Sequence, residues 1–354
     1  MIRTLIGIAA LAISGNAVAA DPPVFTHDWS EYPSWSVFGV AEELGLINKD
    51  EGEMGSIEEK YNVDIVLRSK DYDTCITLFT SGNSDSTCLT NMDSMAPSLS
   101  IPATIVLPTS NSYGADMLIV DDDSVKTIED LKNVPVRGLE LSVSQYLFER
   151  GLQVNGFDPI DFEFQNMGPD AAAMALQQDD PDVNAIAVWN PFALQTLNSR
   201  EGVRVLIDSR AIENEIIDCI VVSNKALERD GGDRYVQALI ETFFTVVDRM
   251  NGQDRQARDD TLIALGERFS NLGLRDMRQV VRQTRFYNTP QEAIALMSGE
   301  EIVETMNLVT DFGYRQSMVS RRPVIEINGA TVIGEGDVDL SFDPSHLQTY
   351  IDNN

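Results

Sequence analysis

The sequence is poor in the side chains from which catalytic and metal centres are usually built. Only two histidines, His27 and His346, and three cysteines occur among its 354 residues, which excludes a zinc site of the familiar spacing. The sequence has no Gly-x-Ser-x-Gly, no His-Glu-x-x-His and no phosphate-binding glycine loop. Neither histidine has a nearby Ser, Cys or Asp arranged like a catalytic triad. We therefore expect a protein that is not an enzyme and that needs no cofactor and no metal.

Positive charge is also scarce. Lysine and arginine number 26 against 56 aspartates and glutamates, so the formal net charge is −30 at pH 7. Such a surface repels nucleic acid and anionic lipid, which excludes both as partners. A solvated acidic shell that suits a salty habitat is the simplest interpretation, because salt at marine strength screens any longer-range attraction of cations.

Long apolar runs are absent after the first twenty residues, since no later stretch reaches the roughly 18 apolar residues of a membrane-spanning helix. The beginning of the chain is different. One positive charge at Arg3 precedes an apolar stretch at 5–13, and small residues follow at Ala17, Ala19 and Ala20. This pattern is typical of a secretory signal peptide over residues 1–20, cleaved near Ala19 or Ala20. We therefore expect an exported, periplasmic protein without membrane insertion.

Export to an oxidising compartment permits disulfides. Cys75 and Cys88 are thirteen residues apart and form a candidate disulfide, but the spacing fits two free thiols equally well. Cys219 lies in the apolar run 216–222, where a cysteine behaves as a small buried hydrophobic residue. The cysteines therefore predict at most one bridge.

Strand-like and helix-like segments alternate over the first two thirds of the chain, which indicates an α/β fold with largely parallel sheets. Strands are expected at 63–67, 86–89, 103–107, 117–120, 162–164, 185–189 and 203–207, and helices at 73–80, 142–155 and 170–178. The last third is mainly helical, with an apolar stripe at helical spacing over 236–250 and a capping box at Thr289–Glu292. An Asn328–Gly329 turn predicts a hairpin over 324–333.

The length suits two domains, yet no flexible linker separates them. Two lobes joined by strands that cross between them explain this, and the apolar runs at 117–120 and 216–222 are the candidate crossing strands. We expect lobe 1 to contain residues 21–117 and 223–354, and lobe 2 to contain residues 118–222.

Ligands of open α/β sheets bind beyond the carboxyl ends of the strands, so residues that directly follow the expected strands are candidates for a binding site. Aromatic, amide, hydroxyl and carboxylate side chains collect at these places: Trp29, Tyr32, Trp35, Asn91, Asp93, Glu140, Ser142, Trp189 and Asn190. A single tryptophan is more often a packing residue, but two tryptophans and a tyrosine within 29–35 favour the wall of a ligand site.

Two of these residues are carboxylates that precede expected helices. An N-cap is the simplest explanation of Asp93, whereas Glu140 is a poor N-cap residue. The amino end of a helix is a ready anion site, and carboxylates placed there leave no room for an anionic ligand. The pattern therefore favours a neutral or cationic ligand with hydrogen-bond donors, which aromatic faces stack against or hold by cation–π contact.

Seven stretches of the sequence resemble the periplasmic solute-binding proteins of nitrate, sulfonate and taurine ABC importers, and most of all the branch encoded beside urea carboxylase. They are 35–46 (WSVFGVAEELGL), 89–93 (LTNMD), 138–152 (GLELSVSQYLFERGL), 188–191 (VWNP), 216–222 (IIDCIVV), 286–295 (FYNTPQEAIA) and 339–343 (DLSFD). The acidic run 121–123, the heavy overall acidity, and Cys75 and Cys88 depart from that branch.

The resemblance implies a type II periplasmic binding fold, in which two α/β lobes close on one ligand held in the cleft between them. It also implies that the ligand passes to an ABC permease driven by an ATPase, and we expect the binding protein itself to be a monomer. For this branch it implies urea, guanidine or a related small nitrogenous compound. The residues it assigns to the site are Trp35, Asn91, Asp93, Glu140, Trp189 and Asn190, with Asp218 as a further candidate.

Three alternatives remain open. The same fold binds nitrate, bicarbonate or sulfonate, which requires Lys or Arg at the site, and the candidate stretches offer only Arg137. An exported relative of the thiamine-pyrimidine synthesis enzymes requires a reactive histidine or lysine in the cleft. A sensor module that serves a receptor instead of a transporter has the same sequence features.

Overall fold

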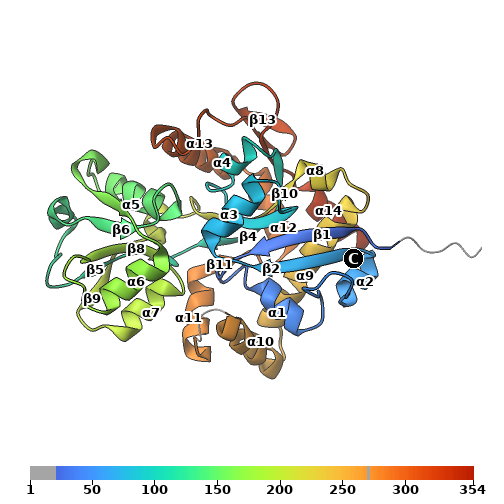
Figure 1. Ribbon diagram of the computed structural model, residues 1–354, viewed down its shortest axis with the longest axis horizontal. Coiled ribbons are helices and arrows are strands. Elements are labelled where there is room, and N and C mark those ends of the chain that lie inside the picture. The colour runs from blue at the N-terminus through green and yellow to red at the C-terminus, as the bar shows by residue number, and fades with distance from the viewer. Residues whose placement is uncertain (1–20, 269–271) are drawn as a thin grey trace, which may run out of the picture.

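The computed structural model describes residues 21–268 and 272–354, so the predicted signal peptide lies outside the described residues. Two β-sheets lie side by side, and each is flanked by helices (Figure 1). The nine-stranded sheet defines lobe 1, and the five-stranded sheet defines lobe 2. The predicted α/β fold is therefore confirmed.

Lobe 1 is built on the strand order β13-β12-β14-β4-β10-β3-β1-β2, with β11 paired to β4. The central strands β3, β4 and β10 are buried along their whole length, which is why they consist largely of apolar and small residues. The strands are β1 (Val24–Trp29), β2 (Asp64–Ser69), β3 (Ser86–Thr90), β4 (Ala103–Ser112), β10 (Ile217–Ser223), β11 (Thr284–Phe286), β12 (Ile325–Ile327), β13 (Ala330–Ile333) and β14 (Leu340–Phe342).

Lobe 2 has the strand order β7-β6-β8-β5-β9. Alternate residues of β5 belong to two separate apolar clusters, with Leu118 and Val120 in one and Met117 and Ile119 in the other, so both faces of this sheet are covered. The strands are β5 (Asp116–Asp121), β6 (Val136–Gly138), β7 (Phe164–Asn166), β8 (Ala185–Trp189) and β9 (Val203–Asp208).

Each sheet contains one strand that enters from the other lobe and runs antiparallel to both of its neighbours. β10 enters lobe 1 and lies between β3 and β4, and β5 enters lobe 2 and lies between β8 and β9. The chain crosses between the lobes at the carboxyl ends of their parallel strands, so a strand that starts there must run against them. The sheets are therefore mixed, but most strands of each sheet run in one direction, so the expected two-lobed α/β architecture with mainly parallel sheets is confirmed.

The crossings themselves are short segments outside the sheets. Residues 113–115 connect β4 to β5, and residues 209–216, which include the 3-10 helix η3 (Ser209–Ile212), connect β9 to β10. The runs predicted as crossing strands are β5 and β10, each of which lies in one sheet only. Because β10 pairs within lobe 1, residues 217–222 belong to that sheet and not to lobe 2, where the expected boundary places them.

Helices fill the last third of the chain, as the sequence indicates. Those of lobe 1 are α1 (Val37–Glu43), α2 (Ser56–Tyr61), α3 (Tyr72–Thr80), α4 (Met95–Ser98), α8 (Asn224–Leu227), α9 (Gly232–Asn251), α10 (Arg255–Arg268), α11 (Leu274–Gln283), α12 (Pro290–Ser298), α13 (Glu300–Arg315) and α14 (Ser345–Asn353). Lobe 2 has η1 (Ile128–Asn133), α5 (Val143–Val154), η2 (Pro159–Asp161), α6 (Pro169–Gln177) and α7 (Phe192–Ser199). The apolar stripe of α9 is buried from Val236 to Met250.

The predicted hairpin is confirmed by the antiparallel pairing of β12 with β13 and by positive φ at Asn328 and Gly329.

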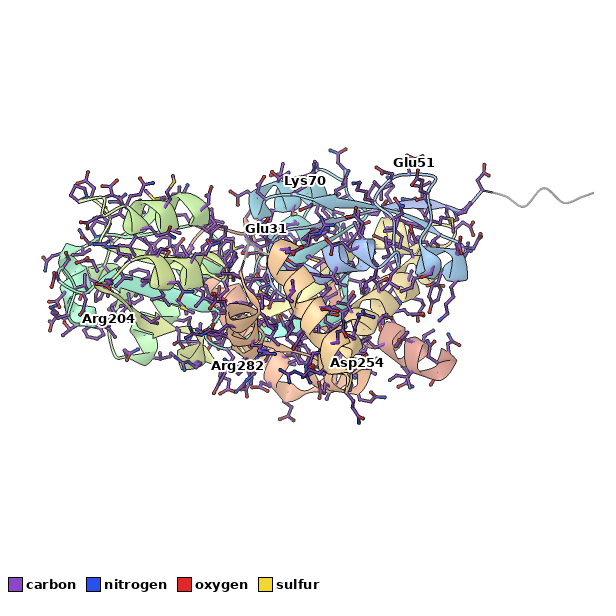
Figure 2. All side chains as sticks on the ribbon, turned by 90° about the horizontal axis from the view of Figure 1, so that it is seen from below. Glu31, Glu51, Lys70, Arg204, Asp254 and Arg282 are labelled. Carbon is purple, nitrogen blue, oxygen red and sulfur yellow. The ribbon has the colours of Figure 1, made fainter. Side chains whose placement is uncertain are left out.

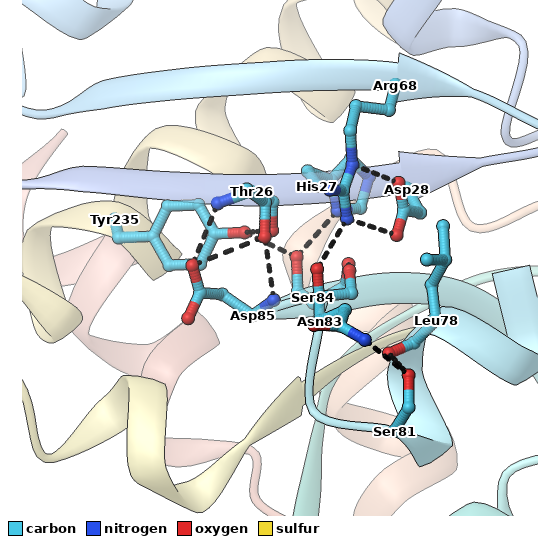
Figure 3. A network of polar contacts seen from close by, with 11 residues as sticks. Thr26, His27, Asp28, Arg68, Leu78, Ser81, Asn83, Ser84, Asp85 and Tyr235 are labelled. Carbon is cyan, nitrogen blue, oxygen red and sulfur yellow. Dashed lines mark hydrogen bonds and ion pairs between the residues drawn. The ribbon is translucent and has the colours of Figure 1, made fainter. Parts of the chain in front are cut away.

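A buried polar network ties β1 to its neighbours in lobe 1 (Figure 3). His27 Nδ1 lies 2.6 Å from Ser86 Oγ, which lies 2.5 Å from the hydroxyl of Tyr235 on α9. Arg68 on β2 donates two hydrogen bonds to Asp28, of 2.6 and 2.7 Å. Burial, with the nearby Arg68 charge, lowers the pKa of His27 to about 3, so the ring is neutral at physiological pH. We conclude that His27 is a structural residue.

Charged side chains occupy the outside of both lobes, as Figure 2 shows for Glu51 and Asp254 on lobe 1 and Arg204 on lobe 2. Arg204 forms an ion pair with Asp122 of the acidic run, and both side chains are partly exposed. Over the part of the chain that the structure describes, no helix combines the length and the apolar character needed to cross a membrane.

Glu215, in the crossing segment 209–216, joins that segment to α5 of lobe 2. Its carboxylate accepts hydrogen bonds from Arg150 Nε (2.9 Å), Arg150 Nη2 (2.7 Å) and the hydroxyl of Tyr146 (2.5 Å). The side chains of Arg150 and Glu215 are only 18% and 12% exposed. Glu213, two residues earlier, pairs with Arg285, and in that pair the side chains are 47% and 43% exposed.

Replacing Glu215 by alanine is expected to lower the free energy of unfolding by about 3 kcal/mol, because the change leaves a buried guanidinium and a phenol without their acceptor. Glu213→Ala removes the exposed pair from the same segment and is expected to cost less than about 1 kcal/mol. Urea denaturation of both variants measures the difference. Equal losses would contradict the structural role of Glu215.

Candidate ligand-binding site

A small chamber lies between the lobes, where the carboxyl ends of the parallel strands of both sheets meet. Its wall consists of Tyr32, Trp35, Tyr72, Thr90, Asp116, Val143, Trp189, Ile216 and Asp218. β3, β10 and α3 of lobe 1 supply one part of this wall, and β5, β8 and α5 of lobe 2 supply another. The chamber has a volume of about 10 Å³, which is roughly the space of one water-sized molecule, so a ligand of several heavy atoms fits only when the walls move apart. It is complete only when both lobes are in contact.

A larger vestibule of about 790 Å³ lies outside the chamber. Its wall consists of Ser30, Glu31, Ser69, Lys70, Asp71, Tyr72, Asp73, Leu139, Gly168, Pro169, Asp170, Trp189 and Phe192. Two of these residues, Glu31 and Lys70, lie on the side of lobe 1 that is turned toward lobe 2 (Figure 2). Tyr72 and Trp189 belong to both walls, and their rings meet edge to face with centroids 5.8 Å apart. These two rings therefore lie between the vestibule and the chamber.

Four aromatic side chains form a continuous part of the chamber wall. The rings of Tyr32 and Trp35 lie 4.9 Å apart, and Trp35 stacks on Tyr72 at 5.5 Å with an interplanar angle of 14°. The turn after β1 brings the first two together, because the Trp35 N–H donates to the Tyr32 carbonyl at 3.0 Å. The structure thus assembles three of the sequence-predicted aromatic residues, Tyr32, Trp35 and Trp189, and adds Tyr72. Their rings offer stacking and cation–π contact to a ligand.

Two carboxylates from opposite lobes line the chamber. Asp116 is the first residue of β5 and pairs with Trp189 in the strand register, and its carboxylate accepts a hydrogen bond of 2.5 Å from Ser112 Oγ. Asp218 is the second residue of β10, and it accepts a hydrogen bond from its cross-strand neighbour Ser110. Both side chains are buried, with at most 3% of each residue exposed.

Burial raises the pKa of both side chains. The pKa of Asp116 rises to about 7, and the charge of nearby Asp93 adds to the effect of burial. The pKa of Asp218 rises well above its ordinary value because of burial and the Asp116 charge. No lysine or arginine is among the described residues that line the chamber. The chamber therefore gathers acidic groups without a counter-charge, and a cation placed there stabilises their ionised forms.

Asp93 lies behind this wall. Its Oδ2 accepts a hydrogen bond of 2.7 Å from the Tyr72 hydroxyl, and its backbone N–H donates to Thr90 Oγ1 at 3.1 Å. Burial raises the pKa of Asp93 to about 6, although the hydrogen bond from Tyr72 lowers it. Asp93 is not the cap of the helix that follows it, because the N-cap of α4 is Ser94 and no side chain caps that helix. Asp93 instead holds the Tyr72 ring in the chamber wall.

The two candidate amides, Asn91 and Asn190, lie beside the chamber and not in its wall. Asn91 Oδ1 accepts the Ile217 N–H at 3.1 Å, and its amide group donates to a carbonyl of the crossing segment at 3.2 Å. Asn190 Oδ1 accepts the Leu194 N–H at 3.2 Å, and Nδ2 donates to Gln283 at 3.1 Å. Both amides are thus engaged with the protein itself and position the segments around the chamber.

Three further candidates also lie outside the wall. Trp29 is a core residue, and its ring packs so closely on α1 that a Cβ at Gly39 would lie 2.9 Å from it. Ser142 is the N-cap of α5, and its Oγ accepts a backbone N–H of the first turn at 3.2 Å. The Glu140 residue is exposed, and its backbone N–H donates to a side chain of β7 at 3.1 Å. The structure does not bring Glu140 to the carboxylates of the chamber.

Several residues of the wall do not lie at the carboxyl ends of strands. Tyr72 and Val143 begin helices and Asp116 begins a strand, so their positions in the sequence do not predict a place in the site. A signal for Asp116 was present nevertheless. It directly precedes the crossing run 117–120, and Asp218 lies near the start of the run 216–222.

Cys75, Cys88 and Cys219 are free, buried thiols, so the candidate disulfide between the first two is not formed. Cys88 Sγ instead lies 3.5 Å from His27 Nε2. Burial raises the pKa of Cys75 to about 12 and that of Cys88 well above its ordinary value, so neither is a reactive thiolate at neutral pH. Within residues 21–268 and 272–354, no three His, Cys, Asp or Glu side chains are grouped so that they could hold a metal ion.

Solved structures of several bacterial binding proteins share this architecture. The periplasmic aliphatic sulphonate binding protein SsuA from Escherichia coli aligns with a TM-score of 0.65 at 17% identity, over 90% of this chain and 94% of that chain. The alkanesulfonate-binding protein SsuA from Xanthomonas axonopodis pv. citri, bound to MOPS, aligns with a TM-score of 0.67 at 16% identity, over 86% of this chain and 96% of that chain. No family model and no curated protein matches the chain. At these identities the likeness shows the fold, and the predicted periplasmic binding protein fold is confirmed.

Proposed function

We propose that this chain is the periplasmic solute-binding protein of an ABC importer, and that it captures a small cationic, nitrogen-rich solute of the guanidine class. The observation that carries the proposal is the pair of buried carboxylates, Asp116 and Asp218, which face one small chamber from opposite lobes. The fold shared with periplasmic binding proteins supports the general role. The resemblance to the branch encoded beside urea carboxylase supports a nitrogenous solute.

Charge and shape favour guanidinium over the neutral members of this class. A guanidinium presents N–H donors along each of its edges, so it satisfies a carboxylate on either side at the same time. The faces of Trp35 and Trp189 suit its flat, delocalised charge. Urea and short amides have comparable donors but no charge to balance Asp116 and Asp218, so they are expected to bind more weakly.

Ligand binding and lobe closure are coupled in this arrangement. Asp116 belongs to lobe 2 and Asp218 to lobe 1, so a cation between them interacts with both only in the closed form. A ligand shifts a conformational equilibrium by its differential affinity for the two forms. Closure is therefore driven by the second carboxylate contact, and an ABC permease with its ATPase is the partner that accepts the closed complex.

The rival functions fit the chamber less well. The neighbours named above bind sulphonates, but an anion in this chamber meets two buried carboxylates and no lysine or arginine among the described residues of the wall. An enzyme of the thiamine-pyrimidine synthesis type requires a reactive histidine or lysine. His27 is held inside the β1 network, away from the wall, and Lys70 lines the vestibule but not the chamber. A sensor module would use the same chamber, so the chamber does not distinguish a protein that serves a permease from one that serves a receptor.

Isothermal titration of the mature protein with guanidinium, urea, acetamide, nitrate and taurine in an amine-free buffer tests the proposal. We expect guanidinium to bind most tightly, by about tenfold or more over urea, since only guanidinium balances the buried charge. Binding of nitrate or taurine, with no heat from the nitrogenous donors, would overturn the cationic-ligand proposal while leaving the binding-protein role intact.

A further inference from the structure

Two hydrogen-bond donors in the wall of the chamber have no acceptor within the described part of the protein. They are the indole N–H of Trp35 and the hydroxyl of Tyr32, and neither group has a hydrogen-bond partner among the described residues. Both residues line the chamber and are only 3% exposed. A buried donor without an acceptor is rare in folded proteins, because it gives up its hydrogen bonds to water and gains none in return. We therefore expect the acceptor to come from the ligand.

The two donors come from a single turn of lobe 1, which connects β1 to α1. The Trp35 backbone N–H donates to the Tyr32 carbonyl at 3.0 Å, and the two ring centroids lie 4.9 Å apart. An indole N–H is a donor only. Burial, together with the charges of Asp218 and Asp116, raises the pKa of Tyr32 well above its ordinary value, so its hydroxyl keeps its proton at neutral pH. The turn thus presents two neutral donors beside the buried carboxylates.

The hydroxyl groups of other residues in the wall are already in use. The Tyr72 hydroxyl donates to Asp93 Oδ2 at 2.7 Å, and Thr90 Oγ1 accepts the backbone N–H of Asp93 at 3.1 Å. The donors without an acceptor are therefore a feature of the turn after β1 and not of the whole wall.

We propose that the solute carries a neutral carbonyl oxygen beside its cationic N–H groups, and that Trp35 and Tyr32 recognise this oxygen. This inference rests on the proposed function, because it specifies the ligand of the same chamber. Water that enters the chamber offers an acceptor oxygen to both donors, so a ligand that displaces the water loses affinity unless it does the same. Guanidinium itself has N–H donors and no acceptor, so it leaves both donors without a partner.

The charge of the wall decides between the two common kinds of acceptor oxygen. A carboxylate group also accepts hydrogen bonds, but in this chamber it meets Asp116 and Asp218 and no lysine or arginine among the described residues of the wall. A carbonyl oxygen carries no net charge and avoids this repulsion. A guanidine-class cation with a carbonyl group therefore satisfies the carboxylates and the donors at the same time.

Guanylurea and biguanide are a matched pair of probes for this inference. Both are monocations at pH 7 with a guanidine-like end, but guanylurea has a carbonyl oxygen where biguanide has a nitrogen that carries hydrogen. Titration calorimetry of the mature wild-type protein is expected to show that guanylurea binds at least about tenfold more tightly than biguanide, because only guanylurea offers an acceptor to the buried donors. Guanidinoacetate, which has a carboxylate, is expected to bind more weakly than guanylurea.

Two variants remove the donors one at a time. Trp35→Phe removes the indole N–H, and Tyr32→Phe removes the hydroxyl and keeps the ring. In each variant the preference for guanylurea over biguanide is expected to fall by at least about threefold. This preference is a ratio of two affinities measured on one protein, so a general loss of stacking cancels. If circular dichroism shows that Trp35→Phe is unfolded, Tyr32→Phe decides the test.

Tyr72→Phe is the matched control, because it removes a hydroxyl of the same wall that already donates to Asp93. The control is expected to keep the wild-type preference. A preference that falls in a donor variant and is kept in Tyr72→Phe supports the inference.

The other outcomes separate the two proposals. The inference is overturned, and the cationic-ligand proposal left intact, if the wild-type protein binds guanylurea no more tightly than biguanide or less tightly than guanidinoacetate. The same holds if the preference survives in both donor variants or falls equally in Tyr72→Phe. If neither guanylurea nor biguanide binds and nitrate or taurine does, the proposed function fails and the inference fails with it.

Discussion

Replacing Asp218 or Asp116 by asparagine is expected to weaken guanidinium binding by about 100-fold or more. Removal of one partner from a buried charge pair commonly costs about 2–5 kcal/mol, and each factor of ten in affinity corresponds to about 1.4 kcal/mol. Both residues are at most 3% exposed, so water cannot replace the lost carboxylate. Titration calorimetry of the two single variants measures the loss.

The matched control is Asp64→Asn. Asp64 is also a buried aspartate, 4% exposed, but it lies at the amino end of β2 and its carboxylate accepts a backbone N–H from Gly52 at 2.7 Å. Its replacement is expected to leave guanidinium affinity within about twofold of the wild-type value. Retention of full affinity by Asp116→Asn and Asp218→Asn would show that the ligand binds elsewhere, and an equal loss in Asp64→Asn would indicate a general effect on folding.

The stability of the unliganded protein is expected to depend strongly on pH, because Asp116 is buried. The pKa of Asp116 is about 7 in the folded chain, because of burial, against an ordinary value of 3.8. The folded state therefore holds the proton more tightly than the unfolded state, and stability falls as pH rises from about 4 to about 7. A shift of this size corresponds to up to about 4 kcal/mol of stability lost at pH 8.

Asp116→Asn removes this pH dependence. The variant is expected to be more stable than the wild-type protein at pH 8 by a few kcal/mol, and about equally stable at pH 4, as measured by urea denaturation without ligand. Guanidinium binding to the wild-type protein is expected to show the complementary trend, with affinity falling as pH drops below about 7 because protons compete for Asp116. Stability curves of wild type and variant that run parallel from pH 4 to 8 would contradict the burial of an ionisable group at this position.

The sequence predicts much of the wall of the chamber, including the carboxylate of Asp218, but it misses Asp116 and adds Asp93 and Glu140, which lie outside the wall. Tyr32 and Trp35 follow β1 and Trp189 ends β8, and all three lie in the wall, as expected for residues at the carboxyl ends of strands. Asp116 and Tyr72 begin their elements, so the same rule misses them. Asp116 reaches the cleft because β5 runs antiparallel to its neighbours, which places the amino end of β5 beside their carboxyl ends.

The polar candidates show a second reason why the sequence does not predict every residue of the binding site. Asn91, Asn190 and Glu140 have side chains suited to a nitrogenous ligand, and the two asparagines directly follow residues of the wall in the sequence. Both amides, however, are engaged in hydrogen bonds within the protein, and Glu140 is exposed. The identity of a residue predicts what it can bind, but the hydrogen bonds of the folded chain determine whether its donors and acceptors are still available.

The strand order of the two sheets implies a pseudo-symmetry of the site. Lobe 1 contains β2-β1-β3-β10-β4, lobe 2 contains β7-β6-β8-β5-β9, and the entering strand has the same place in both. Asp218 pairs with the last residue of β3, and Asp116 pairs with the last residue of β8, so the two carboxylates are topological equivalents. The ligand therefore meets the same acidic position twice, once from each lobe. A guanidinium ion has identical edges, so it can present the same pair of donors to each side, whereas a molecule with one polar end can match only one of them.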